Sequence, residues 1–183
     1  MRQIWITSDL HFGHNKDFIY KPRGFDSIEE HDKTIIENWN RLVQKEDIVY
    51  ILGDLMLMDN DHGIGCIDQL NGDKIIILGN HDSQSRIELY YNIPSIVEIG
   101  YGLPMKYKGQ PFYLSHYPTL TANEDEDKPL HRRVINLCGH SHTDNPFLDY
   151  NKGLIYHCEL DAHNNEPILL DNILREIQKK EEK

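Results

Sequence analysis

The chain contains 183 residues, 39% of them hydrophobic and 27% charged, proportions typical of a single globular domain extending over residues 1–183. Its formal net charge of −11 argues against a broad face for nucleic acid or an anionic membrane, so we expect a small partner rather than a polymer. No apolar run approaches the ~20 residues that span a bilayer, and a strand pattern directly after Gln3 leaves no room for a signal sequence, which predicts a cytoplasmic protein.

Apolar stretches that end on metal-binding side chains occur three times in the first half of the chain. Residues 4–11 contain Asp9 and His11, residues 48–54 end on Asp54, and residues 74–82 run from an aliphatic stretch into Gly79-Asn80-His81-Asp82. Each apolar stretch is typical of a buried strand. In open α/β sheets, sites form outside the carboxyl ends of the strands, so we expect these side chains to meet at one edge.

Helical patterns separate these strands. Residues 12–25 are predicted to form a loop at the mouth of the site, and Ser27 with Glu30 gives a capping-box signature for a helix that runs to about Val43. The apolar residues of this helix share one face, which predicts packing on the sheet. Residues 55–65 are predicted as a loop, residues 64–70 as a short helix, and Ser83 as the cap of a helix to about Tyr91. The alternation of strands and helices indicates a layered α/β protein.

Shorter strands dominate the second half of the chain. They are predicted at residues 96–99, 105–107, 111–115, 134–138 and 154–158, and a terminal helix is predicted at residues 168–180. The strand at 111–115 leads into His116, and the strand at 134–138 leads into Gly139-His140-Ser141-His142. Residues 121–128 are predicted as an acidic surface loop. These elements predict two sheets with helices outside.

The strand-end side chains form a set of seven candidate metal ligands: Asp9, His11, Asp54, Asn80, His116, His140 and His142. Asp9 and His11 are two residues apart, as are His140 and His142, so each pair faces one side of an extended segment. Seven donors are about what two metal ions need, and the two oxygens of Asp54 allow it to bridge both ions. Carboxylate, amide and imidazole donors without a thiolate suit Mn²⁺, Fe, Zn²⁺ or Ni²⁺ better than Ca²⁺ or a structural zinc.

Taken together, the motifs resemble those of the calcineurin-like metallophosphoesterases. The matching blocks are Asp9-x-His11, Gly53-Asp54, Gly79-Asn80-His81-Asp82, a later lone His116, and Gly139-His140-x-His142. They occur in the family's order within residues 4–142, and the short chain resembles the compact bacterial and phage branch. The resemblance implies a four-layer αββα sandwich of two mixed sheets flanked by helices, with a dimetal site at the carboxyl ends of the strands.

The resemblance also implies a role for each matching residue. Asp9, His11, Asp54 and His142 would hold one metal ion, and Asp54, Asn80, His116 and His140 the other, with Asp54 as the bridge. His81 would contact the phosphate and help to protonate the leaving group. Mn²⁺ is the expected metal, with Fe, Zn²⁺ or Ni²⁺ as alternatives. Two such ions clamp a phosphoryl group and acidify a bridging water, which attacks in line as hydroxide.

Several residues carry weaker expectations. His14 and Arg23 are predicted as substrate contacts, and Arg132 with Arg133 is a further candidate for contacting a substrate phosphate. A surface salt bridge is the default interpretation for these arginines. Asp82 is predicted either to orient the His81 ring or to be a plain acid at a helix N-terminus. The remaining histidines have no motif support and are predicted as surface or structural residues: His31, His62, His131, His157 and His163. Three cysteines without CxxC spacing (Cys66, Cys138 and Cys158) are predicted as small buried residues.

The sequence therefore predicts a metal-dependent phosphohydrolase that cleaves small phosphodiesters in an open cleft. A phosphomonoesterase and a nucleotide pyrophosphohydrolase are the alternatives, and the acidic balance disfavours a nuclease. A non-catalytic scaffold of the same fold is a further alternative, which the complete set of ligand types argues against. Residues 118–130 are the expected specificity element, and the oligomeric state, a homodimer included, is left open.

Overall fold

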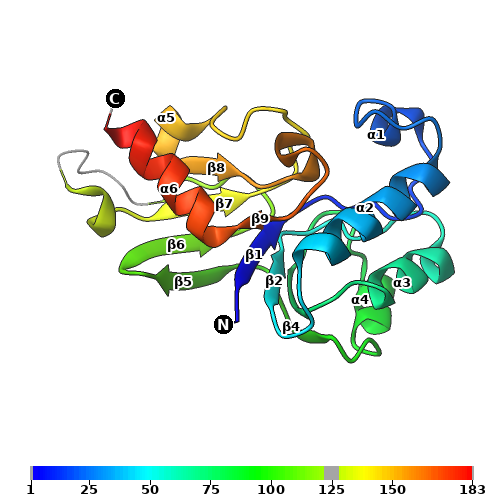
Figure 1. Cartoon of the computed structure of the whole chain (residues 1–183). Coiled ribbons are helices and arrows are strands. Elements are labelled where there is room, and N and C mark those ends of the chain that lie inside the picture. The colour runs from blue at the N-terminus through cyan, green and yellow to red at the C-terminus, as the bar shows by residue number, and fades with distance from the viewer. Residues whose placement is uncertain (1, 122–127, 183) are drawn as a thin grey trace.

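Two mixed β-sheets face each other in the computed structural model, which describes residues 2–121 and 128–182 (Figure 1). The first sheet has the strand order β4-β3-β2-β1-β9, and the second has the order β5-β6-β7-β8. The strands are β1 (Ile4–Thr7), β2 (Ile48–Ile51), β3 (Asp73–Ile77), β4 (Ile96–Gly100), β5 (Leu103–Tyr107), β6 (Gln110–Leu114), β7 (Ile135–Cys138), β8 (Ile155–His157) and β9 (Ile168–Leu169). Strands β1 to β4 run parallel, and so do β6 to β8, whereas the edge strands β9 and β5 are antiparallel to their neighbours.

Three helices cover the outer face of the first sheet: α2 (Ile28–Leu42), α3 (Asn60–Asp68) and α4 (Gln84–Tyr90). The Ser27 hydroxyl accepts a hydrogen bond from the Glu30 backbone N–H at 3.2 Å, so the predicted N-cap of α2 is present. Ile35 and Trp39 of α2 are fully buried against this sheet, which explains the one-sided apolar pattern in the sequence.

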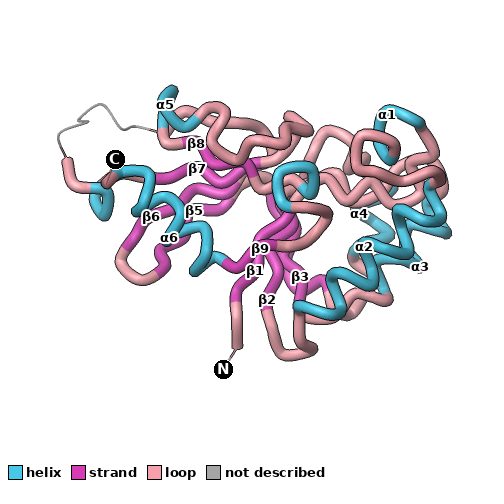
Figure 2. Tube along the Cα trace, turned by 45° about the horizontal axis from the view of Figure 1, so that its top comes forward, coloured by secondary structure: helices cyan, strands magenta, loops and turns pink. Residues whose placement is uncertain are grey.

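A second apolar core fills the space between the two sheets. It combines Ile6 and Leu52 of the first sheet region with Phe112 and Leu137 of the second, and helix α6 (Leu170–Glu181) inserts Ile173 and other apolar side chains into the same core. Figure 2 shows α6 running beside both sheets. Helix α6 also accepts a hydrogen bond from β8, and the short helix α5 (Tyr150–Gly153) contacts β8 as well. The predicted αββα class, two mixed sheets flanked by helices, is confirmed.

Several element boundaries differ from the sequence-based expectation. Helix α3 begins inside the predicted loop, because the Asp59 carboxylate caps it by accepting from the His62 backbone N–H at 3.0 Å. The predicted mouth loop contains a short helix, α1 (Asp17–Tyr20), and the predicted terminal helix begins only after β9. Single 3-10 turns, η1 (Leu130–Arg132) and η2 (Leu160–His163), were not expected either. The core of the predicted acidic loop, residues 122–127, lies outside the described residues.

The turn between β5 and β6 agrees with its sequence. Lys108 and Gly109 both have positive φ angles, 47° and 86°, and Tyr107 pairs directly with Gln110. Two consecutive positive φ values define the two-residue turn that matches strand twist in a hairpin. Among the described helices, none is long and apolar enough to cross a membrane.

Candidate metal centre

Five of the predicted ligands have a backbone conformation that residues other than glycine rarely adopt. The φ angles are 58° at Asp9, 52° at His11, 55° at Asp54, 74° at His140 and 48° at His142. Strained backbone of this kind concentrates at functional sites, where the surrounding structure enforces it. At Asp9, His11 and Asp54, hydrogen bonds between the loops that follow β1 and β2 hold this conformation, from Asp9 N to Gly53 O and from His11 N to Asp54 O, both 3.0 Å long.

Glycines beside these ligands make room for the side chains. A Cβ atom on Gly139 would overlap the Asp9 carboxylate, and one on Gly79 would overlap the Asp54 carboxylate. Gly53 has a φ of 96°, and a Cβ there would lie 2.5 Å from Nδ1 of His116. The glycines of the three motifs are therefore required by close packing at the site.

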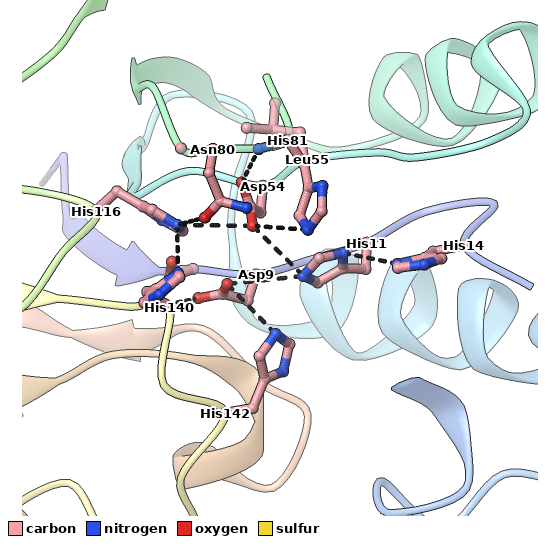
Figure 3. Close-up of polar contacts among 12 residues, drawn as sticks. Asp9, His11, His14, Asp54, Leu55, Asn80, His81, His116, His140 and His142 are labelled. Atoms are coloured by element: carbon pink, nitrogen blue, oxygen red, sulfur yellow. Dashed lines mark hydrogen bonds and ion pairs between the residues drawn. The ribbon is translucent and has the colours of Figure 1, made fainter. Parts of the chain in front are cut away.

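The seven predicted ligands converge at the carboxyl ends of the strands (Figure 3). Oδ2 of Asp54 lies 3.8 Å from Nε2 of His11 and 3.6 Å from Nε2 of His116, so it stands between two groups of ligands. Oδ1 of Asp9 lies 3.7 Å from Nε2 of both His11 and His142. On the other side, Nε2 of His116 lies 3.0 Å from the Asn80 side-chain oxygen and 3.2 Å from Nδ1 of His140.

Two triplets of side chains have ligand atoms within 4.8 Å of one another, Asp9–His11–His142 and Asp9–Asp54–His116. Oδ1 of Asp9 and Nε2 of His11 are buried and have no hydrogen-bond partner among the described residues. Buried polar atoms normally have partners, so two orphans that face each other point to a cation between them. The donors present therefore fit a pair of divalent metal ions.

The electrostatics of the site favour a neutral His11 and an ionised Asp9, the protonation states in which these two side chains can bind a metal ion. Burial lowers the pKa of His11 to about 4 against the opposing attraction of Asp9, so the imidazole is neutral near pH 7. Burial opposes ionisation of Asp9, but hydrogen bonding and the charges of His11 and His142 hold its pKa well below its usual range. Burial raises the pKa of Asp54 to about 6, although the nearby His116 opposes this effect. Bound cations would favour the ionised form of that carboxylate.

His81 lies at the open side of the centre. Its side chain is 38% exposed, and its Nε2 is 3.9 Å from Oδ2 of Asp54, while its backbone N–H donates to Oδ1 of Asp54 at 2.9 Å. It belongs to neither triplet of ligands. The predicted separation between metal-binding residues and His81 is therefore compatible with its position.

Asp82 has a different environment from either prediction made for it. Its carboxylate accepts from the backbone N–H groups of Asp54 at 2.9 Å and Gly79 at 2.8 Å, and from the Tyr90 hydroxyl at 2.8 Å. It is 6% exposed and neither orients the His81 ring nor acts only at the start of α4. Asp82 instead ties together the loops after β2 and β3 that present Asp54 and Asn80.

Arg23 was predicted to contact substrate or to form a surface salt bridge; it forms a salt bridge with Asp161, but its guanidinium is fully buried beneath the site. It donates to both oxygens of Asp161, at 3.1 and 2.7 Å, and to the backbone oxygen of Asp9 at 2.8 Å. A side chain held in this way has no free face for a phosphate. The same structure reveals Asp161, whose Oδ2 lies 3.1 Å from Nδ1 of His142 and holds that ring with Nε2 toward Asp9.

Asp161 carried no signal in the sequence, because it lies outside every motif and 19 residues beyond His142. Burial opposes ionisation of this carboxyl, but hydrogen bonds from His142 and Arg23 hold its pKa well below its usual range. The same pairing raises the pKa of His142 against the effect of its burial. Arg23, Asp161 and His142 therefore form one connected hydrogen-bonded group under the centre.

His14 and two exposed aromatic side chains form the rim of the centre. Nδ1 of His14 lies 3.1 Å from Nδ1 of His11, and burial, with the charge of His81, lowers the pKa of His14 to about 4. Phe18 is 69% exposed, and its ring centroid lies 5.6 Å from that of His14. Tyr117 is 51% exposed, with its ring 4.6 Å from that of His140. No sequence motif indicated a role for these two aromatic residues.

The histidines without motif support lie outside the centre. His31 and His157 are fully buried and hydrogen-bonded to carboxylates, His31 to Asp32 and His157 to Asp149, which is a structural role. His131 is exposed. The three cysteines are free and buried, as expected for small apolar residues.

Comparisons with known proteins identify the family of this chain. A family profile described as calcineurin-like phosphoesterase matches residues 2–183. An uncharacterized protein of Methanocaldococcus jannaschii is 32% identical over 98% of this chain and 93% of its own length. The gene 66 protein of Mycobacterium phage L5 is 30% identical over 81% of this chain and 80% of its own length.

Solved structures share the fold. A protein of unknown function from Aquifex aeolicus has a TM-score of 0.72 and 24% identity, covering 98% of this chain and 99% of its own. A structure described as a novel archaeal phosphodiesterase has a TM-score of 0.50 and 17% identity, covering 92% of this chain and 99% of its own. At these identities the likeness concerns the fold alone.

Proposed function

This chain belongs to the calcineurin-like phosphoesterase family, and from that membership we propose that it hydrolyses small phosphodiesters with two divalent metal ions. The observation that carries the proposal is the position of Asp54. Its Oδ2 stands between His11 and His116, at 3.8 and 3.6 Å, and so between the two groups of ligands. A carboxylate in that position suits a bridge between two ions.

The proposed ligands divide around this bridge. Asp9, His11 and His142 would join Asp54 on one ion, and Asn80, His116 and His140 would join it on the other. Mn²⁺ is the proposed native metal, because oxygen and imidazole donors without thiolate suit it, with Fe, Zn²⁺ or Ni²⁺ as alternatives. When bound, such a pair of ions supplies positive charge to a phosphoryl group and lowers the pKa of an attacking water.

The protein's own residues supply position and protons. The backbone N–H of His81 fixes one oxygen of Asp54, which leaves the other oxygen directed at the ligands on both sides. The His81 ring is partly exposed and 3.9 Å from that oxygen, which supports the proposed role of donating a proton to a leaving alkoxide. His14 is neutral near pH 7 and lies beside His11, so it contributes a hydrogen bond rather than a charge.

The surroundings of the centre suit a small substrate. A hollow of about 430 Å³ adjoins it, lined by Arg23, His142, Thr143, Asp144, Asp161 and others, and its acidic side chains disfavour a highly charged leaving group. Phe18 and Tyr117 offer exposed rings on either side, which suit an apolar or aromatic ester group. A phosphodiester carries one negative charge and two ester groups, which matches this environment.

The test is hydrolysis of bis-p-nitrophenyl phosphate against p-nitrophenyl phosphate by chelator-stripped protein with Mn²⁺ added back. We expect the diester to be cleaved with the larger kcat/KM, and only after the metal is restored. Preference for the monoester would replace the proposal with a phosphomonoesterase. If neither ester is hydrolysed while two ions are bound, the result would point to a pyrophosphate substrate. If nucleoside diphosphates are not hydrolysed either, it would point to a non-catalytic scaffold.

A further inference from the structure

A second cluster of metal-binding side chains lies between helices α2 and α3, apart from the candidate metal centre. It consists of Asp32 from α2 and of His62 and Cys66 from α3. Nε2 of His62 lies 2.7 Å from Oδ2 of Asp32 and 3.4 Å from Sγ of Cys66. The three ligand atoms all lie within 4.8 Å of one another.

Helix geometry accounts for the convergence of these three groups. His62 and Cys66 are four residues apart in α3, so their side chains occupy the same face one turn apart. Asp32 faces them from α2, and its carboxylate is already oriented by two further contacts. Oδ1 lies 2.7 Å from Nδ1 of His31, and Oδ2 accepts from the Gly13 backbone N–H at 2.9 Å. A carboxylate oxygen has room for one more partner beside that N–H.

The cluster is buried at its base and open at its top. Asp32 and Cys66 are buried, whereas the side chain of His62 is 43% exposed. His62 lines two surface hollows, one of about 690 Å³ beside Gly13 and Asp59 and one of about 410 Å³ beside Asp32 and Cys66. An ion can therefore reach the three side chains from solvent and keep a water molecule as an additional ligand.

We propose that Asp32, His62 and Cys66 form a further site for a divalent cation of the zinc type. Thiolate, imidazole and carboxylate are the three donors that Zn²⁺ prefers, and three protein ligands with one water complete its tetrahedral shell. Tetrahedral zinc places neighbouring N, O and S ligand atoms ~3.3–3.8 Å apart, from bond lengths of ~2.0–2.3 Å. The separation of His62 and Cys66 already fits, at 3.4 Å. The contact between His62 and Asp32 opens by about half an ångström when the ion replaces the bridging proton.

Binding at this site exchanges a proton for the ion. The Cys66 S–H bond breaks, the proton passes to water, and the sulfur binds the cation as thiolate, while His62 binds through Nε2 as a neutral imidazole that carries its one ring proton on Nδ1. No oxidant or reductant is needed. Burial and the nearby charges of Asp32 and Asp59 raise the pKa of the Cys66 thiol to about 12, so the thiol stays protonated until an ion is bound.

The thiolate separates this site experimentally from the candidate metal centre, whose ligands include no cysteine. Titration of reduced, chelator-stripped protein with Co²⁺ therefore gives a thiolate-to-cobalt charge-transfer band only from a cysteine site. We expect this band in the wild-type chain and its loss in Cys66→Ser. The matched control is Cys138→Ser, which removes another buried cysteine and keeps the band.

His62→Ala provides a second variant, because an exposed side chain can be truncated without loss of the fold. We expect the band to disappear or the affinity for Co²⁺ to fall at least tenfold. His131→Ala, at another exposed histidine, is the control. Zinc counted by mass spectrometry after dialysis against excess Zn²⁺ should fall by one equivalent in Cys66→Ser. That difference does not depend on how many ions the other centre holds.

Two results would overturn the proposal. The first is a wild-type protein that shows no charge-transfer band at saturating Co²⁺. The second is a band that survives Cys66→Ser or disappears in Cys138→Ser. Neither result bears on phosphodiester hydrolysis, which depends on a different set of residues, so the two proposals can fail separately.

Discussion

At the scale of single residues, the position of Asp54 between the two groups of ligands separates the roles of neighbouring side chains. Asp54→Asn removes the charge at the proposed bridge, so we expect metal content to fall together with kcat. His81→Ala leaves all seven ligands in place, so we expect normal metal content with kcat reduced ~10²–10⁴-fold, the usual contribution of a proton donor. Metal analysis and steady-state kinetics on the same preparations measure both quantities. Equal metal loss in the two variants would contradict the separate roles.

Asp161 offers a test of a residue that acts through a ligand. Its carboxylate holds Nδ1 of His142 and is itself held by Arg23, so the ring presents Nε2 to the centre. We expect Asp161→Asn to weaken metal affinity by ~10–100-fold, the range found for outer partners of metal ligands. Calorimetric titration of Mn²⁺ into stripped protein measures the change.

The control for Asp161 is Asp171→Asn, which neutralises a carboxylate paired with Lys108 on the surface of α6. It should bind Mn²⁺ like the wild type. Because Arg23 loses its charged partner in Asp161→Asn, circular dichroism should first establish that the variant is folded. A folded variant with wild-type affinity would mean that His142 keeps its orientation without Asp161.

At the scale of elements, the loops that follow the strands depend on glycine for the placement of the ligands. Gly139→Ala would push a methyl group into the Asp9 carboxylate and Ser8, so we expect a loss of about 1–3 kcal/mol in unfolding free energy, together with weaker metal binding. Gly100→Ala, at the end of β4 with open space around it, is the matched control. Urea denaturation of the metal-free proteins compares the two.

The strand-end positions of the candidate ligands were predictable because each motif combines an apolar strand with the residues after it. The pattern at residues 74–82 is an example, since β3 is buried over residues 74–77 and the loop that follows β3 presents Asn80 and His81. The start of α3 was not predictable, because Asp59 acts as its cap within a stretch that also contains two glycines. Arg23 and Asp161 meet across 138 positions, a contact that no local pattern encodes.

At the scale of the whole molecule, one buried cation links stability to pH. Lys74 is fully buried, and its Nζ donates to the backbone oxygens of Leu70 and Gly72, at 2.6 and 3.0 Å, and to Oγ of Ser95 at 3.0 Å. Burial lowers the pKa of Lys74 to about 8 from an ordinary value of 10.5. The unfolded chain therefore binds the proton more tightly than the folded chain does.

It follows that the unfolding free energy should rise with pH between about 8 and 10.5, by about 3 kcal/mol at ~1.36 kcal/mol per pKa unit. This contribution is complete above the unfolded pKa and is lost as the pH falls through the folded one. Chemical denaturation across that range measures the slope. Lys74→Met should remove this component of the slope, whereas Lys152→Met, at an exposed position, should leave it unchanged. An identical slope in all three proteins would contradict the assignment.

The left-handed backbone at the five ligands has a further consequence for how this chain would respond to directed evolution. Glycine adopts such φ values without a steric penalty, so glycine at any of these five positions would have less backbone strain than the aspartate or histidine that is there. A library screened only for heat resistance of the metal-free protein should therefore enrich substitutions such as His140→Gly. Screening for turnover at the same time should remove them, so the two selections would draw the sequence in opposite directions at the same five codons.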